Sequence, residues 1–262
     1  MLLQITNKCH MMCPHCLQDS KPEGKHMTLE TFNKVLQFML YCGINYVTIS
    51  GGEPTEHPDI EKICQVLHNH KIQFSICSNG MWAKDDSLIT KVYGILAMSS
   101  CRGMQVYSNP KWYKEHEYIM SRKSTTFSHP KIAMPDNDIL SMQDIGRART
   151  CEAAKAEALK SPYFMSCLNG CLIAKQSKDL RHFFALFVNN GILCKPLIDY
   201  RGIIHMSESW LCPDCGDIMN DSYLQIWCKI ASSKPCLGCI NSKKFMESTR
   251  LDIIHSRKLL KL

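Results

Sequence analysis

The sequence predicts an α/β protein whose strands form a parallel sheet or barrel. Short apolar strands alternate with amphipathic helices through the first 110 residues, and the connections between them are short. Three clusters of polar or cysteine residues each follow directly on a predicted strand. In parallel sheets the working groups lie on the loops that leave the C-terminal ends of the strands. We therefore expect the three clusters to meet at one edge of the sheet.

The helix that begins after Thr28 illustrates the pattern, because Thr28 can cap its start and Gly43 can end it. Its apolar residues fall on one face at helical spacing. The same reasoning predicts strands over residues 2–6, 46–49, 73–77 and 103–107, and helices over residues 28–42, 57–70 and 88–96. Later elements are less regular: we expect a strand within 131–134, helices at 146–160 and 180–188, and a short strand at 202–204.

Composition describes an ordinary globular chain of 262 residues, with 45% hydrophobic and 21% charged residues. No apolar stretch is long enough to cross a bilayer, and no signal peptide is visible. Sixteen cysteines without export features indicate a reducing compartment, so we expect a cytoplasmic protein without a membrane partner. The net charge of +7 comes from scattered Lys and Arg, which permits an anionic partner without requiring one.

The first cluster is a C-x3-C-x2-C run formed by Cys9, Cys13 and Cys16. Disulfides across so few residues would be strained, so a site for a soft metal is the better interpretation. Three thiols are one fewer than the four ligands that close a structural zinc or iron–sulfur site. Either a distant fourth ligand completes the set, or one metal position is left open.

The other two clusters are Gly51-Gly52-Glu53-Pro54 and Ser78-Asn79-Gly80. Two glycines allow a backbone to approach a ligand closely, and a carboxylate suits an ammonium group. Each cluster alone could be an ordinary turn. Their order after the cysteine run gives them more weight.

Together the three clusters resemble those of the radical S-adenosylmethionine (SAM) enzymes over roughly the first 110 residues. The resemblance implies a partial (β/α)6 TIM-like barrel at residues 1–190, in which Cys9, Cys13 and Cys16 hold a [4Fe–4S] cluster. SAM would occupy the fourth iron. Gly51, Gly52, Glu53 and Pro54 would bind the SAM amino group, and Ser78 and Asn79 would reach its ribose and carboxylate. His15 stands where the family usually has an aromatic residue, so it either packs near the adenine or faces solvent.

A second group of cysteines has the form C-x2-C…C-x2-C, at Cys212, Cys215, Cys236 and Cys239. This spacing alone is typical of a zinc ribbon. With Gly202-Ile203-Ile204 before it and residues 224–227 between the pairs, it resembles the C-terminal auxiliary-cluster (SPASM/twitch-like) module of radical SAM enzymes. That resemblance implies a module with a C-terminal helix at residues 191–262 and a second [4Fe–4S] cluster, with zinc as the alternative. The implied ligands are Cys194, Cys212, Cys236 and Cys239, with Cys215 an alternative to Cys212 and Cys228 an extra thiol.

Other residues allow two interpretations each. Cys167 and Cys171 are expected to be a buried structural pair, though they could supply a ligand or a hydrogen donor. Cys42, Cys64 and Cys77 are expected in the core. Gly146-Arg147-Ala148-Arg149 resembles a Gly-Arg-Ala stretch of several family members. One interpretation is that an arginine here pairs with the SAM carboxylate, and the other is a surface charge.

The resemblance implies an oxidoreductase or peptide-modifying enzyme that takes hydrogen from a peptide or small molecule, with an electron donor such as flavodoxin or ferredoxin. The competing hypothesis is a zinc-ribbon-bearing nucleic-acid-binding module without SAM chemistry. It leaves Cys9–Cys16 and the Gly-Gly-Glu-Pro loop unexplained, and Lys and Arg are not clustered with aromatic residues as it requires. No residue stands out as a general base.

Overall fold

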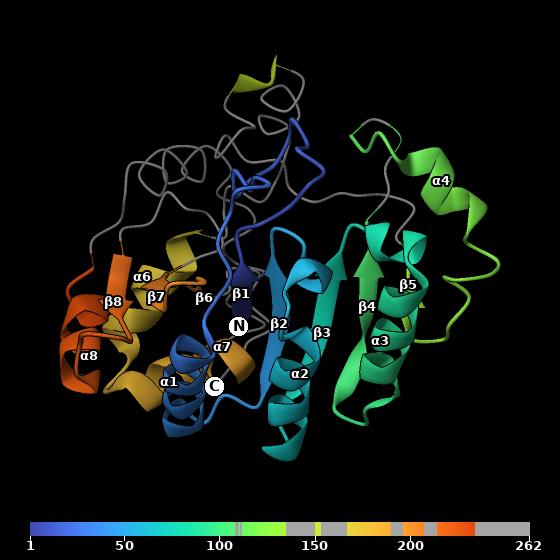
Figure 1. The fold of residues 1–262 in the computed structure, drawn as a ribbon. Helices are drawn as coiled ribbons and strands as arrows, with labels where there is room; N and C mark the ends of the chain where they lie inside the picture. Colours follow the sequence, from blue (N-terminus) through green and yellow to red (C-terminus); the bar gives the residue numbers. More distant parts are fainter. Residues whose placement is uncertain are drawn as a thin grey trace, which may run out of the picture.

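In the part of the chain that the computed structural model describes, eight strands form one mixed sheet. The described residues are 1–107, 110, 112–134, 150–152, 167–189, 196–206 and 214–233. The strands lie in the order β5-β4-β3-β2-β1-β6-β7-β8 (Figure 1). Their bounds are β1 Leu2–Thr6, β2 Tyr46–Gly51, β3 Gln73–Ser78, β4 Cys101–Val106, β5 Ile132–Ala133, β6 Leu197–Ile198, β7 Ile203–His205 and β8 Asp214–Asp217. From β5 to β6 in this order the strands pair in parallel, which confirms the largely parallel α/β fold expected from the sequence.

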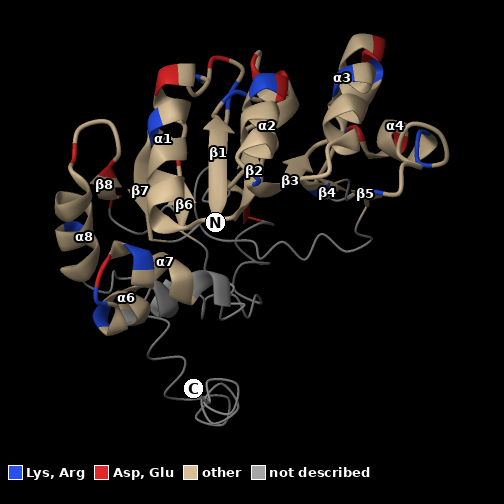
Figure 2. Cartoon of the chain, turned by 90° about the horizontal axis from the view of Figure 1, so that it is seen from below, with Lys and Arg blue, Asp and Glu red and all other residues tan. Residues whose placement is uncertain are grey.

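Helices α1, α2 and α3 connect the first four strands and stand side by side on one face of the sheet (Figures 1 and 2). As predicted, the hydroxyl of Thr28 caps α1 by accepting from the Thr31 backbone, and Gly43 ends it in the left-handed conformation. Lys and Arg are interspersed with Asp and Glu over these helices, and no patch of one sign stands out in this view (Figure 2). The helical bounds are α1 Leu29–Cys42, η1 Pro54–Glu56, α2 Ile60–Asn69, η2 Met81–Lys84, α3 Asp86–Ala97, α4 His116–Ser121, α6 Cys167–Gln176, α7 Leu180–Asn189 and α8 Tyr223–Ala231.

Alternate residues of the central strands pack with the helices in one hydrophobic core. Val47 and Ile49 of β2 and Phe74 and Ile76 of β3 are fully or almost fully buried there. Cys42 and Cys64 lie in this core, as expected from the sequence. None of the helices in the described ranges is long and apolar enough to span a bilayer.

The opposite face of the central strands is neutral and polar. Register partners on this face are Gln4 with Ser50, Thr48 with Ser75, and Cys77 with Gln105. The prediction that Cys77 lies in the core is therefore wrong. Because Phe74 and Ile76 point to the helices, Cys77 points to the other face, where it is half-buried and its Sγ lies 3.8 Å from the hydroxyl of Tyr107.

The far end of the sheet is formed by residues from late in the chain. β6 pairs in parallel with β1, through Leu2 with Leu197 and Leu3 with Ile198, while β7 and β8 continue as an antiparallel hairpin. Helix α8 packs on this hairpin and begins at a capping box formed by Ser222 and Gln225. The boundary proposed at residue 190 lies outside the described residues.

Candidate functional site

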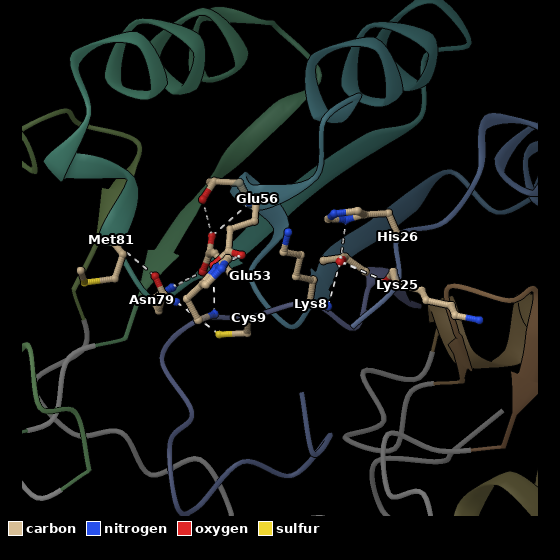
Figure 3. Close-up of polar contacts among 11 residues, drawn as sticks. Lys8, Cys9, Lys25, His26, Glu53, Glu56, Asn79 and Met81 are labelled. Atoms are coloured by element: carbon tan, nitrogen blue, oxygen red, sulfur yellow. Dashed lines mark hydrogen bonds and ion pairs between the residues drawn. The ribbon is translucent and has the colours of Figure 1, made fainter. Parts of the chain in front are cut away.

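The loops after β1, β2 and β3 meet at one edge of the sheet, as the sequence predicted for its three clusters (Figure 3). The backbone N–H of Gly52 donates to the carbonyl of Thr6, and that of Glu53 donates to the carbonyl of Lys8, both at 2.8 Å. The side-chain amide of Asn79 reaches the sulfur of Cys9, with Nδ2 and Sγ 3.7 Å apart. Segments up to 70 residues apart in sequence are thereby held together.

The glycines in this region are required by the close approach of two backbones. A Cβ added at Gly52 would lie 2.0 Å from the carbonyl oxygen of Lys8, and one added at Gly24 would lie 2.0 Å from that of Asn7. Gly51 has a φ of +146°, which side chains rarely adopt. Residues 7 and 8, which lead from β1 into the cysteine run, are therefore packed against backbone segments where any side chain would clash.

The carboxylate of Glu53 is buried and serves these loops as a hydrogen-bond acceptor. Its Oε1 accepts from the backbone N–H and hydroxyl of Thr55, at 3.1 and 2.7 Å, and from the hydroxyl of Ser78 at 2.9 Å. Its Oε2 accepts from the backbone N–H of Asn79 at 2.7 Å. Burial raises the pKa of Glu53, and these hydrogen bonds oppose the rise. The side chain thus joins the loops after β2 and β3.

The three cysteines of the first run lie on one loop. Cys9 is partly buried, and burial raises the pKa of its thiol to about 12, with the charges of Glu53 and Glu56 acting in the same direction. The sulfur of Cys16 accepts from the backbone N–H of Ser20 at 3.4 Å. Between them Met12 has a φ of +48°, a conformation in which a residue other than glycine is uncommon.

The donor set of this loop fits an iron–sulfur cluster better than a single ion. Within the described ranges no three His, Cys, Asp or Glu side chains are grouped closely enough to hold one metal ion. A [4Fe–4S] cluster distributes its ligands over separate iron atoms, so its thiolates stand further apart than the ligands of one zinc. Three thiols on this loop would leave the fourth iron of such a cluster without a ligand from the loop.

Two contacts of the cysteine loop could not be read from spacing. His10 Nδ1 lies 2.6 Å from Glu56 Oε2, and the His10 backbone N–H donates to Glu56 Oε1 at 3.2 Å. His15 is buried rather than facing solvent, with its ring 5.1 Å from the rings of both Trp112 and Tyr113. These partners lie 46 and about 100 residues away, and no local pattern marks them.

The second group of cysteines is described only in part. Cys215 is buried in β8, with its Sγ 3.5 Å from the hydroxyl of Ser233, while Cys228 is exposed on α8. Burial raises the pKa of Cys215, and the neighbouring thiol of Cys171, which is buried on α6, raises it further. The other predicted residues, Cys194, Cys212, Cys236, Cys239 and Gly146–Arg149, lie outside the described residues, as does the side chain of Cys167.

A buried charged group, not singled out in the sequence, links the end of β6 to the β7–β8 hairpin. The fully buried Asp199 follows β6, and its Oδ2 accepts from Arg201 Nε and Nη2 at 2.9 and 2.6 Å. The ring of His205 lies between two carboxylates, 3.3 Å from Asp199 and 3.2 Å from Asp214. Burial raises the pKa of Asp199, but hydrogen bonds from His205, Arg201 and the backbone outweigh it, so the pKa is lowered.

The N-terminal part of the chain, which contains the three loops, is similar in sequence to known proteins. Residues 3–91 match the family model of the radical SAM superfamily. A probable GTP 3',8-cyclase of Methanococcus vannielii is 31% identical over 116 residues, which are 43% of this chain and 38% of that protein. A PqqA peptide cyclase of Bradyrhizobium diazoefficiens is 36% identical over 64 residues, which are 24% of this chain and 17% of that protein. The alignments thus span well under half of either relative.

A solved structure extends the likeness to most of the fold. Streptococcus suis SuiB, bound to its precursor peptide SuiA, superposes with a TM-score of 0.51 at 14% sequence identity. The superposition covers 86% of this chain and 63% of SuiB. At this identity the likeness establishes the fold alone, and it agrees with the α/β fold predicted from the sequence.

Proposed function

We propose, from the match of residues 3–91 to the radical SAM superfamily model, that the chain reductively cleaves SAM and takes hydrogen from a peptide or small-molecule substrate. Cys9, Cys13 and Cys16 are the proposed ligands of a [4Fe–4S] cluster whose open iron binds SAM. A cluster held there would pass one electron to the SAM sulfonium, which would give methionine and a 5′-deoxyadenosyl radical able to take the substrate hydrogen. The observation that carries the proposal is the meeting of three strand-end loops, with Asn79 in contact with Cys9.

The loop residues have distinct roles in this proposal. Since the Glu53 carboxylate accepts from Thr55, Ser78 and Asn79, its task is to hold the loops in place. We assign the SAM amino group to the backbone of Gly51–Pro54. The ring of His15, packed with Trp112 and Tyr113, is assigned to the adenine side of the pocket.

The substrate is assigned to the polar face of the central strands. This face lies on the same strands as the three loops and presents amide, hydroxyl and thiol groups of Gln4, Ser50, Cys77 and Gln105. Gln4 is fully buried, and no described group donates to its Oε1. Neutral hydrogen-bonding groups suit the amides of a peptide, so a peptide is the substrate class that we favour.

We propose a second [4Fe–4S] cluster in a module at residues 191–262, with Cys194, Cys212, Cys236 and Cys239 as ligands. Cys215 is buried among apolar residues of the core, which favours Cys212 over Cys215 as the ligand. Zinc at this site is the alternative. A low-potential protein such as flavodoxin or ferredoxin would supply electrons, and we expect both to meet in the cytoplasm. The nucleic-acid-binding alternative leaves the match of residues 3–91 unexplained.

The proposal is tested by anaerobic reconstitution followed by counts of iron and sulfide and by assay of 5′-deoxyadenosine after reduction with SAM. Cluster-loaded protein is expected to release 5′-deoxyadenosine. Cys13→Ala should abolish it, whereas Cys42→Ala, which removes a thiol from the core on α1, should not. A reduced, cluster-loaded protein that leaves SAM intact would contradict the proposal.

The auxiliary site needs its own measurement. A variant with alanine at Cys9, Cys13 and Cys16 should retain about four irons if the second site holds a [4Fe–4S] cluster. Retention of zinc instead would establish the zinc alternative.

A further inference from the structure

Three polar groups of Asn79 each contact a different partner (Figure 3). Its backbone N–H donates to Glu53 Oε2 at 2.7 Å. Its side-chain Oδ1 accepts from the backbone N–H of Met81 at 2.9 Å, and its Nδ2 donates to Cys9 Sγ at 3.7 Å. A residue expected to contact SAM is therefore engaged with the cysteine loop.

The orientation of this amide is set by the fold. Only the oxygen of the Asn79 side-chain amide can accept a hydrogen bond from the Met81 N–H. The amide nitrogen must therefore face Cys9. The turn itself is fixed, because Gly80 has a φ of +79° and a Cβ there would lie 2.7 Å from Val106. Glu53, which is 1% exposed, holds the backbone of Asn79 from the other side. The donor therefore points at the sulfur without any contribution from a cluster.

A hydrogen bond to a cluster sulfur stabilises negative charge. The reduced cluster carries one more electron than the oxidised cluster, so a donor at a ligating thiolate favours the reduced state and raises the reduction potential. A nearby carboxylate acts in the opposite direction, and the Glu53 carboxylate is hydrogen-bonded to the backbone of Asn79. The neutral side-chain donor of the same residue contacts Cys9 and counters that effect.

We propose that Asn79 is a positioning residue that sets the reduction potential of the cluster through its hydrogen bond to Cys9. This rests on the proposed function, because it requires that Cys9 ligate the cluster. It departs from the expectation that Asn79 serves the ribose or carboxylate of SAM. It also gives the buried Glu53 a purpose, which is to hold the donor in place.

The test is a redox titration of the reconstituted protein in the absence of SAM, followed by optical and EPR spectra. Asn79→Ala, which removes the donor, should shift the midpoint potential of the cluster bound at Cys9 to a more negative value. Asn79→Asp, which also adds a negative charge, should shift it further. Asn69→Asp is the matched control, since it makes the same change at the exposed end of α2 and should leave the potential unchanged.

Two further measurements separate this role from the others. SAM affinity, measured by equilibrium dialysis, should change by less than a few-fold in Asn79→Ala; a large loss of affinity with an unchanged potential would overturn the proposal. Loss of the cluster from both Asn79 variants would also overturn it, because Asn79 would then determine ligation instead of potential. Failure of the unmodified protein to bind a cluster would instead refute the proposed function.

Discussion

Glu53 and Asp199 are both buried carboxylates, and they follow the two strands that flank β1, yet the protein satisfies them in opposite ways. Within the described part of the chain Glu53 accepts only from neutral groups, and burial raises its pKa. Asp199 is also penalised by burial, but it accepts from Arg201 and His205, and its pKa is lowered. Of these two carboxylates, the one without a cationic partner among the described residues lies beside the cysteine loop.

The comparison assigns different tasks to the two regions. The β7–β8 hairpin beside β6 is held by the carboxylate of Asp199, which pairs with Arg201 and His205. This is the arrangement expected of a structural ion pair. The loops around Glu53 are joined by neutral hydrogen bonds and by close contact between backbones. An uncompensated carboxylate favours a cation nearby, and the proposed ligand SAM carries a sulfonium and an ammonium group.

The largest expected effect comes from Gly52→Ala, which would break the contact of the β2 loop with the cysteine loop. The new Cβ would meet the Lys8 carbonyl oxygen at 2.0 Å, so backbone must move, at a cost of about 4 kcal/mol or more. Urea denaturation followed by circular dichroism measures this loss. Gly94→Ala on α3 is the control; no atom lies within 4 Å of its Cβ, and a gain of about 0.5–1 kcal/mol is expected. Equal midpoints for the two variants would refute the role of Gly52.

Asp199→Asn tests the charged side of the comparison. It leaves Arg201 without its carboxylate and His205 with that of Asp214 alone. Because the Arg201 side chain is half-exposed, we expect a cost at the lower end of the about 3–5 kcal/mol of a fully buried ion pair. The free energy of unfolding from urea titration measures it. Glu115→Gln, which breaks the exposed pair with Lys84, should cost about 1 kcal/mol or less. If both variants lost equally little, Asp199 would not fasten the hairpin.

Glu53→Gln tests the neutral side and should cost less. The amide oxygen can still accept from Thr55 and Ser78, but the new NH2 group faces the Asn79 N–H, and one unsatisfied donor costs about 1–3 kcal/mol. Thermal unfolding measures the loss, and hydrogen exchange should report faster opening of residues 78–81. Glu61→Gln on the exposed side of α2 serves as the control. A loss as large as that of Asp199→Asn would erase the distinction between the two regions.

The smallest expected effect is the change in the free energy of unfolding with pH, which should have opposite signs for Asp199 and Glu53. The native pKa of Asp199 lies below the unfolded value of about 3.9, so its contribution to stability is present above that pH and is lost as pH falls through the native pKa. The native pKa of Glu53 is raised, so the free energy of unfolding should fall as pH rises above about 4.3. Urea titrations across the acid range give the free energy of unfolding as a function of pH. The difference between the unmodified protein and Asp199→Asn or Glu53→Gln gives the slope due to each carboxylate. Slopes of the same sign would contradict the assignment.

Local patterns in the sequence predict the first half of the fold well, because its helices and strands are set by periodicity and caps. Helix α1 begins and ends at the residues that its Thr28 and Gly43 indicate. The meeting of the three clusters follows from the geometry of parallel strands. What could not be predicted depends on residues distant in sequence, such as Glu56 on His10 and Trp112 on His15. Cys77 differs from these cases, because the alternation of Phe74 and Ile76 along the strand already places it on the opposite face.

The position of β1 has a consequence for how the chain folds during synthesis. β1 lies between β2, which follows it by about 40 residues, and β6, which follows it by nearly 200. Contacts among β1–β4 and α1–α3 are local and can form early, whereas the β6 edge of β1 must wait for distant chain. Until β6 is made, one edge of β1 has unpaired backbone donors and acceptors. Such an edge can pair with another chain and cause aggregation. We therefore expect newly made chain to depend on chaperones until β6 emerges from the ribosome.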